Sequence, residues 1–285
     1  MTRRAFVSVL AGALAAACSP LGAFNRFAPR DPARRGPTNV AYGPDPRQRL
    51  DLYAPRTKAV RPWPLLVFFY GGAWNSGRRQ DYEWTGQALA SRGFLVAVVD
   101  HRLVPQVRYP AFVEDGALAV ARVRQLAAGL GGDPGRIAVS GHSSGAYVAS
   151  MLALDPRWLA QAGVVAGKVR AFAGLSGPYD FYPFDVPASV DAFGQAPEPR
   201  LTQPVNLDLS AAPPVFLAHG SRDATVFPRN SQALAAALRA AGRPVELKVY
   251  DGLDHKDGVL VLSRLFRGRA PVLDDMMRFL HAHLG

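Results

Sequence analysis

A pentapeptide with a central serine, Gly141-His142-Ser143-Ser144-Gly145, follows an apolar run and precedes a helix-forming segment. A serine on a sharp strand-to-helix turn projects its hydroxyl out of a sheet, and glycines on either side permit the close backbone packing of such a turn. Because G-x-S-x-G also arises by chance, the pattern indicates a nucleophile only if the partners of the serine exist elsewhere. Ser143 is therefore the candidate nucleophile, and its partners must be sought.

A serine hydroxyl needs a base to take its proton and a carboxylate to orient that base. Of the six histidines, His255 fits best, because it lies in the loop directly after the last strand candidate. Asp223 follows the strand candidate Pro214 to Ala218, so its carboxylate should reach the same edge of a parallel sheet. Asp251 and Asp254 are the alternative carboxylates, although their nearness to His255 in sequence makes their geometry awkward.

Small residues follow an earlier strand candidate in the segment Tyr70-Gly71-Gly72-Ala73-Trp74. They let backbone N–H groups approach a substrate closely, as the developing oxyanion of an acyl-transfer reaction requires. We expect this oxyanion hole to consist of the N–H groups of Gly72, Ala73 and Ser144. The candidates for substrate contact are two large side chains beside these groups, Trp74 and His142.

From residue 37 onward, short apolar runs alternate with helical segments, which predicts one domain with a mostly parallel sheet and helices on both faces. The strand candidates are Leu50–Ala54, Leu65–Tyr70, Phe94–Val99, the run before Ser143, Val169–Leu175, Pro214–Ala218 and Val245–Tyr250. The helix candidates are Tyr82–Ser91, Glu114–Leu130, Ala146–Leu154, Ser231–Ala241 and Pro271–His283. Residues 179–212 lack a clear period, so we expect a long excursion that is a lid, a pocket wall or a plain surface connection.

Three segments resemble known α/β-hydrolases. Tyr70 to Gly77 resembles the oxyanion loop of the carboxylesterase, hormone-sensitive-lipase-like and cholinesterase branches. Asp100 to Pro105, with Tyr109 to Ala111, resembles the D-Y-R-L-A-P…F-P-A segment of the lipase-like branch, and Gly132 to Ile137 is similar to the G-D-P-x-R-I run before their nucleophile. The chain looks like compact bacterial esterases related to isoprenylcysteine methylesterases, feruloyl or acetylxylan-type esterases and kynurenine formamidases.

The resemblance implies an α/β-hydrolase fold and a serine carboxylesterase that acts through an acyl-enzyme, with Ser143, Asp223 and His255 as its triad. Because the chain has no large separate lid insertion, we expect esters with small acyl groups as substrates. No cofactor is implied, and no metal-ligand spacing such as H-E-x-x-H or paired C-x-x-C occurs. Two alternatives stay open: an arylformamidase or other amidase with the same triad, and an envelope binding protein without catalysis.

Some positions depart from the family pattern. Tyr70 stands where a His is frequent, Ala73 replaces a third Gly, and Ser144 stands where Ala or Gly is common. The resemblance also implies that three charged residues hold the loop beside the site, namely Asp100, Arg102 and Asp115.

The chain has 285 residues, 49% hydrophobic composition and a formal charge of +11, with basic residues scattered in short groups. This pattern predicts a solvated basic surface, which aids solubility or attraction to an anionic membrane, and it argues against a nucleic-acid site. The expected partner is a small ester, and no oligomeric state is indicated. Cys18 is the single cysteine, so an intramolecular disulfide is excluded.

The N-terminus has the pattern of a bacterial export signal. Thr2-Arg3-Arg4 resembles a twin-arginine motif, and an apolar stretch too short to span a bilayer leads to Cys18. Cys18 fits either a lipoprotein processing site or plain cleavage nearby. We therefore expect residues 1–18 to be an export signal, residues 19–36 a tether with little fixed structure, and residues 37–285 a catalytic domain that is periplasmic or anchored through a lipid on Cys18. That lipid is the only membrane attachment expected.

Overall fold

The structure, a computed structural model, describes residues 20–57, 60–165 and 167–285 of the chain. The export signal expected at residues 1–18, including Cys18, lies outside these residues. In the described part of the chain, no helix is both long and apolar enough to cross a membrane.

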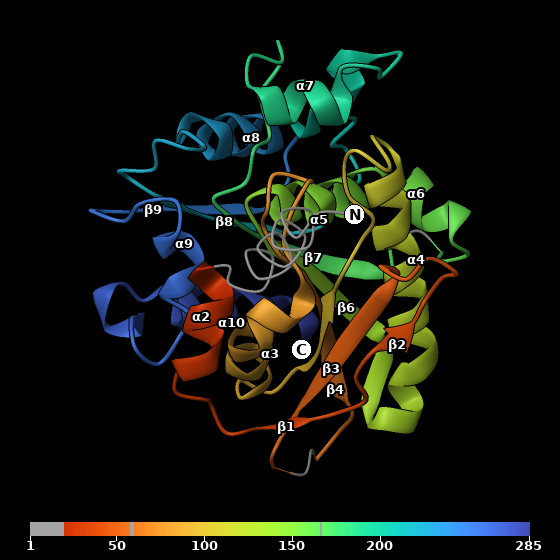
Figure 1. The fold of residues 1–285 in the computed structure, drawn as a ribbon, viewed down its shortest axis with the longest axis vertical. Helices are drawn as coiled ribbons and strands as arrows, with labels where there is room; N and C mark the ends of the chain where they lie inside the picture. The colour runs from red at the N-terminus through yellow and green to blue at the C-terminus, as the bar shows by residue number, and fades with distance from the viewer. Residues whose placement is uncertain (1–19, 58–59, 166) are drawn as a thin grey trace, which may run out of the picture.

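One twisted sheet of nine strands organises the described residues (Figure 1). The strand order is β1-β3-β5-β4-β6-β7-β8-β9, with β2 paired to β3. Strands β4 to β9 run parallel, whereas β3 pairs antiparallel with β1, β2 and β5. The bounds are β1 Ala33–Arg35, β2 Val40–Ala41, β3 Arg49–Pro55, β4 Trp63–Phe69, β5 Leu95–Val99, β6 Gly132–His142, β7 Val169–Leu175, β8 Val215–Gly220 and β9 Val245–Tyr250.

Helices cover both faces of this sheet, so the mostly parallel α/β architecture predicted from the sequence is confirmed. One face carries α4 (Ala111–Ala127), α5 (Ser144–Leu154), α6 (Pro156–Gln161) and α8 (Arg229–Ala240). The other carries α3 (Glu83–Ala90), α9 (Asp257–Leu260) and α10 (Val272–Leu284). Two further helices are α2 (Pro20–Phe27), which packs on the second face through Leu21 and Phe24, and α7 (Pro187–Phe193), which lies at the edge of the view in Figure 1.

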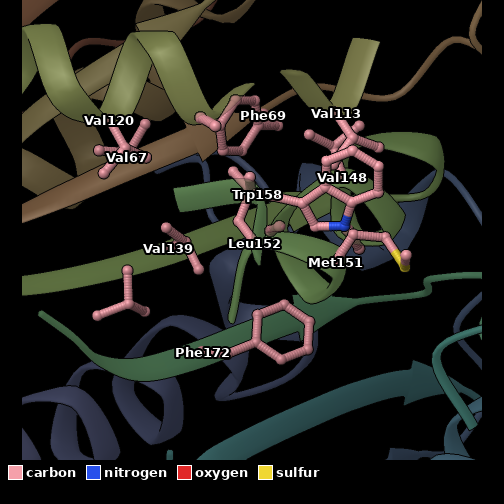
Figure 2. Close-up of a cluster of buried hydrophobic side chains, with 14 of the residues drawn as sticks. Val67, Phe69, Val113, Val120, Val139, Val148, Met151, Leu152, Trp158 and Phe172 are labelled. Carbon is pink, nitrogen blue, oxygen red and sulfur yellow. The ribbon is translucent and has the colours of Figure 1, made fainter. Parts of the chain in front are cut away.

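Alternate residues of β4 point to opposite faces of the sheet, as the two-residue period of a strand requires. Val67 and Phe69 lie in the buried cluster under α4 and α5, whereas Leu66 and Phe68 lie in the cluster under α3 and α10. Figure 2 shows the first cluster, where Val120 of α4 lies beside Val67. Both faces of the strand are therefore buried, which explains its continuous apolar sequence.

The two glycines around the serine are required by close backbone packing. A Cβ atom on Gly145 would overlap the carbonyl oxygens of Phe69 and Tyr70, and one on Gly141 would overlap the carbonyl of Gly145. The start of α5 therefore lies directly against β4 and β6. This crossing leaves no room for a side chain at either position.

The prediction of a loose tether at residues 19–36 is wrong for the described part of that segment. Residues 20–27 form α2, and Ala33–Arg35 form β1, which pairs with β3. Phe24 makes an edge contact with Trp84, with ring centroids 5.2 Å apart, and stacks on Phe266 at 5.8 Å. These tertiary contacts stabilise a segment whose proline and arginine content suggests disorder.

Residues 179–212 form α7 and two short 3-10 helices, Pro199–Thr202 and Pro204–Asn206. Phe181 and Phe193 pack against each other and against Tyr147 of α5. The excursion is therefore anchored on the same helix that follows the serine.

We expect Gly145→Ala to lower the free energy of unfolding by about 1–3 kcal/mol, because the added methyl must displace the backbone of β4. Gly129 is the matched control, since a Cβ there meets nothing within 4 Å. Gly129→Ala should leave the stability unchanged or raise it by up to about 1 kcal/mol. Urea unfolding of both variants measures the difference, and equal stabilities would contradict the packing described here.

Candidate active site

Ser143 occupies the sharp turn between β6 and α5. Its backbone has φ 55° and ψ −128°, a region that non-glycine residues seldom adopt and that carries roughly 1–3 kcal/mol of strain. Two hydrogen bonds hold this conformation: the Ser143 N–H donates to the carbonyl of Leu175 at 2.9 Å, and the Ser143 carbonyl accepts from the N–H of Ala146 at 2.9 Å. The neighbouring strand and the first turn of α5 thus fix the direction of the hydroxyl.

The structure brings the three predicted triad residues into one hydrogen-bonded chain. Ser143 Oγ lies 2.8 Å from His255 Nε2, and His255 Nδ1 lies 2.8 Å from Asp223 Oδ2. With the ring proton on Nδ1, the imidazole donates to the carboxylate and accepts from the serine hydroxyl. This is the geometry in which an imidazole acts as a general base toward a serine.

The Asp223 carboxylate is fully buried and is held by the loop that contains it. Its Oδ1 accepts hydrogen bonds from the N–H groups of Thr225 at 3.0 Å and Val226 at 2.8 Å. Burial alone would raise the pKa of Asp223, but hydrogen bonding to His219 and His255 outweighs it and lowers the pKa below its usual range. The group therefore stays ionised and can stabilise an imidazolium at His255.

His219 is a neighbour of this carboxylate to which the sequence analysis gave no role. Its buried Nε2 lies 3.3 Å from Asp223 Oδ2 and 2.7 Å from the Val226 carbonyl, and its Nδ1 lies 2.7 Å from Ser231 Oγ. The sequence indicates His219 only through its position near the end of β8, four residues before Asp223.

The two alternative carboxylates, Asp251 and Asp254, form hydrogen bonds with groups other than the His255 imidazole. Asp254 Oδ1 accepts from the N–H of Asp257 at 2.9 Å, and Asp251 Oδ1 accepts from the Ser221 hydroxyl at 3.0 Å. Of the three candidates, Asp223 is the one that contacts His255.

His142, a predicted substrate contact, braces the base. Its Nε2 lies 2.8 Å from the backbone carbonyl of His255, and the two rings are 4.9 Å apart between centroids. Burial, followed by repulsion from His255, lowers the pKa of His142 to about 3. The ring is therefore neutral at physiological pH and donates one fixed hydrogen bond to the loop that carries His255.

The predicted oxyanion loop adopts left-handed backbone next to the serine. Ala73 has φ 51° and Trp74 has φ 60°, and the carbonyl of Gly72 accepts from the N–H groups of Asn75 and Ser76 at 3.1 and 3.0 Å. The Gly72 N–H donates to Ser144 Oγ at 3.0 Å. The structure thus brings Gly72 and Ser144 together beside Ser143. The Gly72 N–H, which an oxyanion would need as a donor, is hydrogen-bonded to the Ser144 hydroxyl oxygen.

A buried ionic network supports this loop from behind. The Tyr70 hydroxyl donates to Asp100 Oδ1 at 2.9 Å and accepts from Arg47 at 2.7 Å. Asp100 also accepts from the N–H of Arg79 at 2.7 Å. Tyr70 therefore links the loop to Asp100. Arg102 binds Asp115 at 2.7 Å.

A cavity of about 760 Å³ opens beside these groups, with Gly71, Gly72 and His142 at its inner end. Its apolar walls include Leu21 and Phe24 of α2, Val259 and Leu260 of α9, and Phe266, and residues 76–82 contribute Ser76, Gly77, Arg78, Asp81 and Tyr82. In the described part of the chain, residues 179–212 contribute nothing to this lining. The pocket-wall interpretation of that excursion is therefore wrong for this cavity, and α2 supplies the wall instead.

Trp74 does not line this cavity either. Its side chain is 5% exposed and packs against Phe193 and Tyr147, with ring centroids at 4.8 and 5.6 Å. The left-handed turn at Trp74 directs the indole into the aromatic cluster under the excursion. The prediction that Trp74 contacts substrate is thus not supported by this cavity, and its position indicates a role in anchoring the loop.

Among residues 20–57, 60–165 and 167–285, no group of three or more His, Cys, Asp or Glu side chains is placed to hold a metal ion.

Comparison with known proteins gives one family match and several curated relatives. The BD-FAE family model matches residues 50–238. Isoprenylcysteine alpha-carbonyl methylesterase ICME of Arabidopsis thaliana is 31% identical over 86% of this chain and 62% of that protein. Esterase LipC of Mycobacterium tuberculosis is 32% identical over 72% of this chain and 55% of that protein. The chain therefore spans about three fifths of the length of these relatives.

Among solved structures, esterase B from Lactobacillus rhamnosis, inhibited by a tributyrin phosphonate, superposes with a TM-score of 0.81 at 20% identity. The match covers 99% of this chain and 96% of that one. The expected α/β-hydrolase fold is thereby confirmed.

We expect His142→Gln, which keeps an N–H donor but cannot be protonated, to flatten the pH dependence of stability. The pKa of His142 is about 3 in the folded protein, against about 6.5 in an unfolded chain. Because the folded value is depressed, the stabilisation is complete above pH ~6.5 and is lost as the pH falls toward 3.

The wild type should therefore lose up to about 2 kcal/mol more unfolding free energy than His142→Gln between pH 7 and pH 5. Urea unfolding at several pH values in this window measures the two slopes. Parallel curves for the two proteins would contradict the buried, neutral state of His142.

Proposed function

The chain belongs to the BD-FAE family, and from this premise we propose that it is a serine carboxylesterase that cleaves esters with small acyl groups through an acyl-enzyme. The proposal rests on the unbroken hydrogen-bonded chain from Ser143 through His255 to Asp223, with both distances at 2.8 Å. Relatives and structural neighbours whose printed names are esterases support it.

In the proposed reaction, Ser143 Oγ attacks the ester carbonyl while His255 Nε2 takes the hydroxyl proton. The imidazolium that forms is stabilised by the ionised Asp223, and it then returns the proton to the leaving alcohol. Water enters as the second nucleophile, His255 takes its proton, and the acyl-serine ester breaks to release the acid and restore the serine hydroxyl.

The oxyanion is proposed to bind to the N–H groups of Gly72, Ala73 and Ser144. In the resting structure the Gly72 N–H is bonded to Ser144 Oγ, so this bond must be exchanged for one to the oxyanion. Each such donor typically contributes about 10²- to 10³-fold to turnover.

The proposed substrate is a small, largely uncharged ester. A volume of about 760 Å³ lies within the range typical of small-molecule sites. The apolar walls from α2 and α9 favour an alkyl or aryl group over a sugar. An amidase with the same triad would use the same groups, whereas a binding protein without catalysis would not need them.

We expect Asp223→Asn to lower kcat by on the order of 10⁴-fold, because the imidazole loses its orienting charge, and Ser143→Ala to lower it at least as much. Asp254→Asn is the matched control, since Asp254 binds the backbone of Asp257 instead. It should hydrolyse p-nitrophenyl acetate at close to the wild-type rate.

A panel of p-nitrophenyl esters and N-formylkynurenine, run on the wild type and Ser143→Ala, tests the substrate class. The expected order is acetate and butyrate well above palmitate and above the formamide. Preference for palmitate would refute the small acyl group, and faster formamide cleavage would favour an arylformamidase. Complete inactivity, with no labelling by a fluorophosphonate probe, would favour a binding protein.

We further propose that the protein is exported across a bacterial inner membrane, by the twin-arginine route, to become periplasmic or anchored through a lipid on Cys18. The pattern of residues 1–18 supports this location. Fractionation of expressing cells and mass spectrometry of the N-terminus should find the segment removed. A cytoplasmic protein that keeps Met1 would contradict the proposal.

A further inference from the structure

Helix α2 and the segment after α9 together form one surface of the molecule beside the cavity. Phe24 stacks on Phe266, and Arg264 Nη1 donates to the Arg30 carbonyl at 3.0 Å, so the two segments are joined by both apolar and polar contacts. We call this surface the α2 face; it comprises the arginines that line one hollow, Arg30, Arg56, Arg264 and Arg267, and the exposed Phe27 and Leu265 of the two joined segments.

Two large apolar side chains of the α2 face are exposed to solvent. Phe27 is 82% exposed and Leu265 is 58% exposed. Phe27 follows Phe24 by three residues on the helix, and Leu265 directly precedes Phe266, so both flank the stacked pair that walls the cavity. Single exposed apolar side chains are common on protein surfaces, so their bearing on membrane contact depends on the charges around them.

The same face carries an excess of positive charge. A hollow of about 640 Å³ is lined by four arginines, Arg30, Arg56, Arg264 and Arg267, against a single carboxylate, Asp31. Arg267 pairs with Asp31 at 2.8 Å, and Arg30 lies 3.9 Å from Glu83. Within the described residues, the guanidinium groups of Arg26, Arg56 and Arg264 have no carboxylate within ion-pair distance. The hollow is therefore suited to phosphate groups, which bind arginine well.

We propose that the α2 face docks on the surface of an anionic lipid bilayer, with its arginines at the headgroup phosphates and Phe27 and Leu265 at the acyl boundary. Apolar side chains rimmed by cations are the pattern of interfacial membrane contact. The cavity beside Ser143, which α2 lines through Leu21 and Phe24, lies next to this face. This inference goes beyond the proposed activity, and beyond attachment through a lipid on Cys18.

Two features favour a bilayer over other occupants. A second copy of the chain, related by a two-fold axis, would place the same arginines against each other. A soluble phosphate would use the arginines but would give Phe27 and Leu265 no partner.

Sedimentation of the full-length protein with vesicles tests the proposal. The probes are vesicles of phosphatidylcholine alone and vesicles that also contain phosphatidylglycerol. The wild type should bind the anionic vesicles more tightly. Arg56→Glu combined with Arg264→Glu should weaken this binding at least tenfold, since each cation near an anionic leaflet contributes roughly a fivefold factor. Phe27→Ser should weaken it severalfold.

Arg239→Glu is the matched control, because Arg239 is an exposed arginine on α8 without a carboxylate partner among the described residues. It should bind as the wild type does. Hydrolysis of soluble p-nitrophenyl acetate should be unchanged in every variant, which confirms folding and keeps the result separate from the proposed activity.

The proposal is overturned if neutral and anionic vesicles bind equally, or if the double arginine variant binds as tightly as the wild type. It is also overturned if Arg239→Glu loses as much binding as one substitution in the hollow, since net charge alone would then explain the effect. Unchanged binding by Phe27→Ser would contradict the proposed contact of Phe27 with the acyl boundary. A concentration-dependent dimer that the double variant abolishes would show that the α2 face binds a second copy of the chain.

Discussion

The left-handed backbone at Ser143 is the constraint on which the rest of the site depends. A φ of 55° lets β6 end and α5 begin within a single residue, so the hydroxyl stands above the sheet edge. The turn can form only because Gly141 and Gly145 have no side chains at the point where β4, β6 and α5 meet. The hydrogen bond from the Ser143 N–H to Leu175 then ties the strained residue to the next strand.

The groups that act on the serine are positioned by linked loops rather than by separate ones. The loops after β8 and β9 are joined by the N–H of Ser221 to the carbonyl of Tyr250 at 2.9 Å and by that of Arg222 to Leu253 at 3.0 Å. His142 adds a bond from the serine turn to the His255 carbonyl. Because these loops hold one another, the distance between the base and its carboxylate is fixed by the fold.

Much of the site could be predicted because parallel strands bring their carboxyl ends to one edge. Ser143, Asp223 and His255 each follow one of the parallel strands β6, β8 and β9, so their order along the chain was enough to place them at one edge. Helix α2 could not be found in this way, since it is short and is held by the contacts of Phe24 with Trp84 and Phe266.

The directions of the side chains inside the site could not be predicted from the sequence either. His142, a predicted substrate contact, lines the cavity, but no local pattern indicated its hydrogen bond to the backbone of His255, a partner 113 residues away. The indole of Trp74 turns into the aromatic cluster because of a left-handed φ of 60°. Such long-range hydrogen bonds and positive φ angles depend on the packed fold, and no local pattern of residue types predicts them.

The central claim is that Ser143 is activated as a nucleophile by His255. Rapid quenching of the protein with excess p-nitrophenyl acetate, followed by mass spectrometry of the peptides, tests it most directly. The account predicts one acetyl group on Ser143 in the wild type, and none on Ser144 or in His255→Ala. Acetylation at another residue, or turnover without any acetyl group on Ser143, would contradict it.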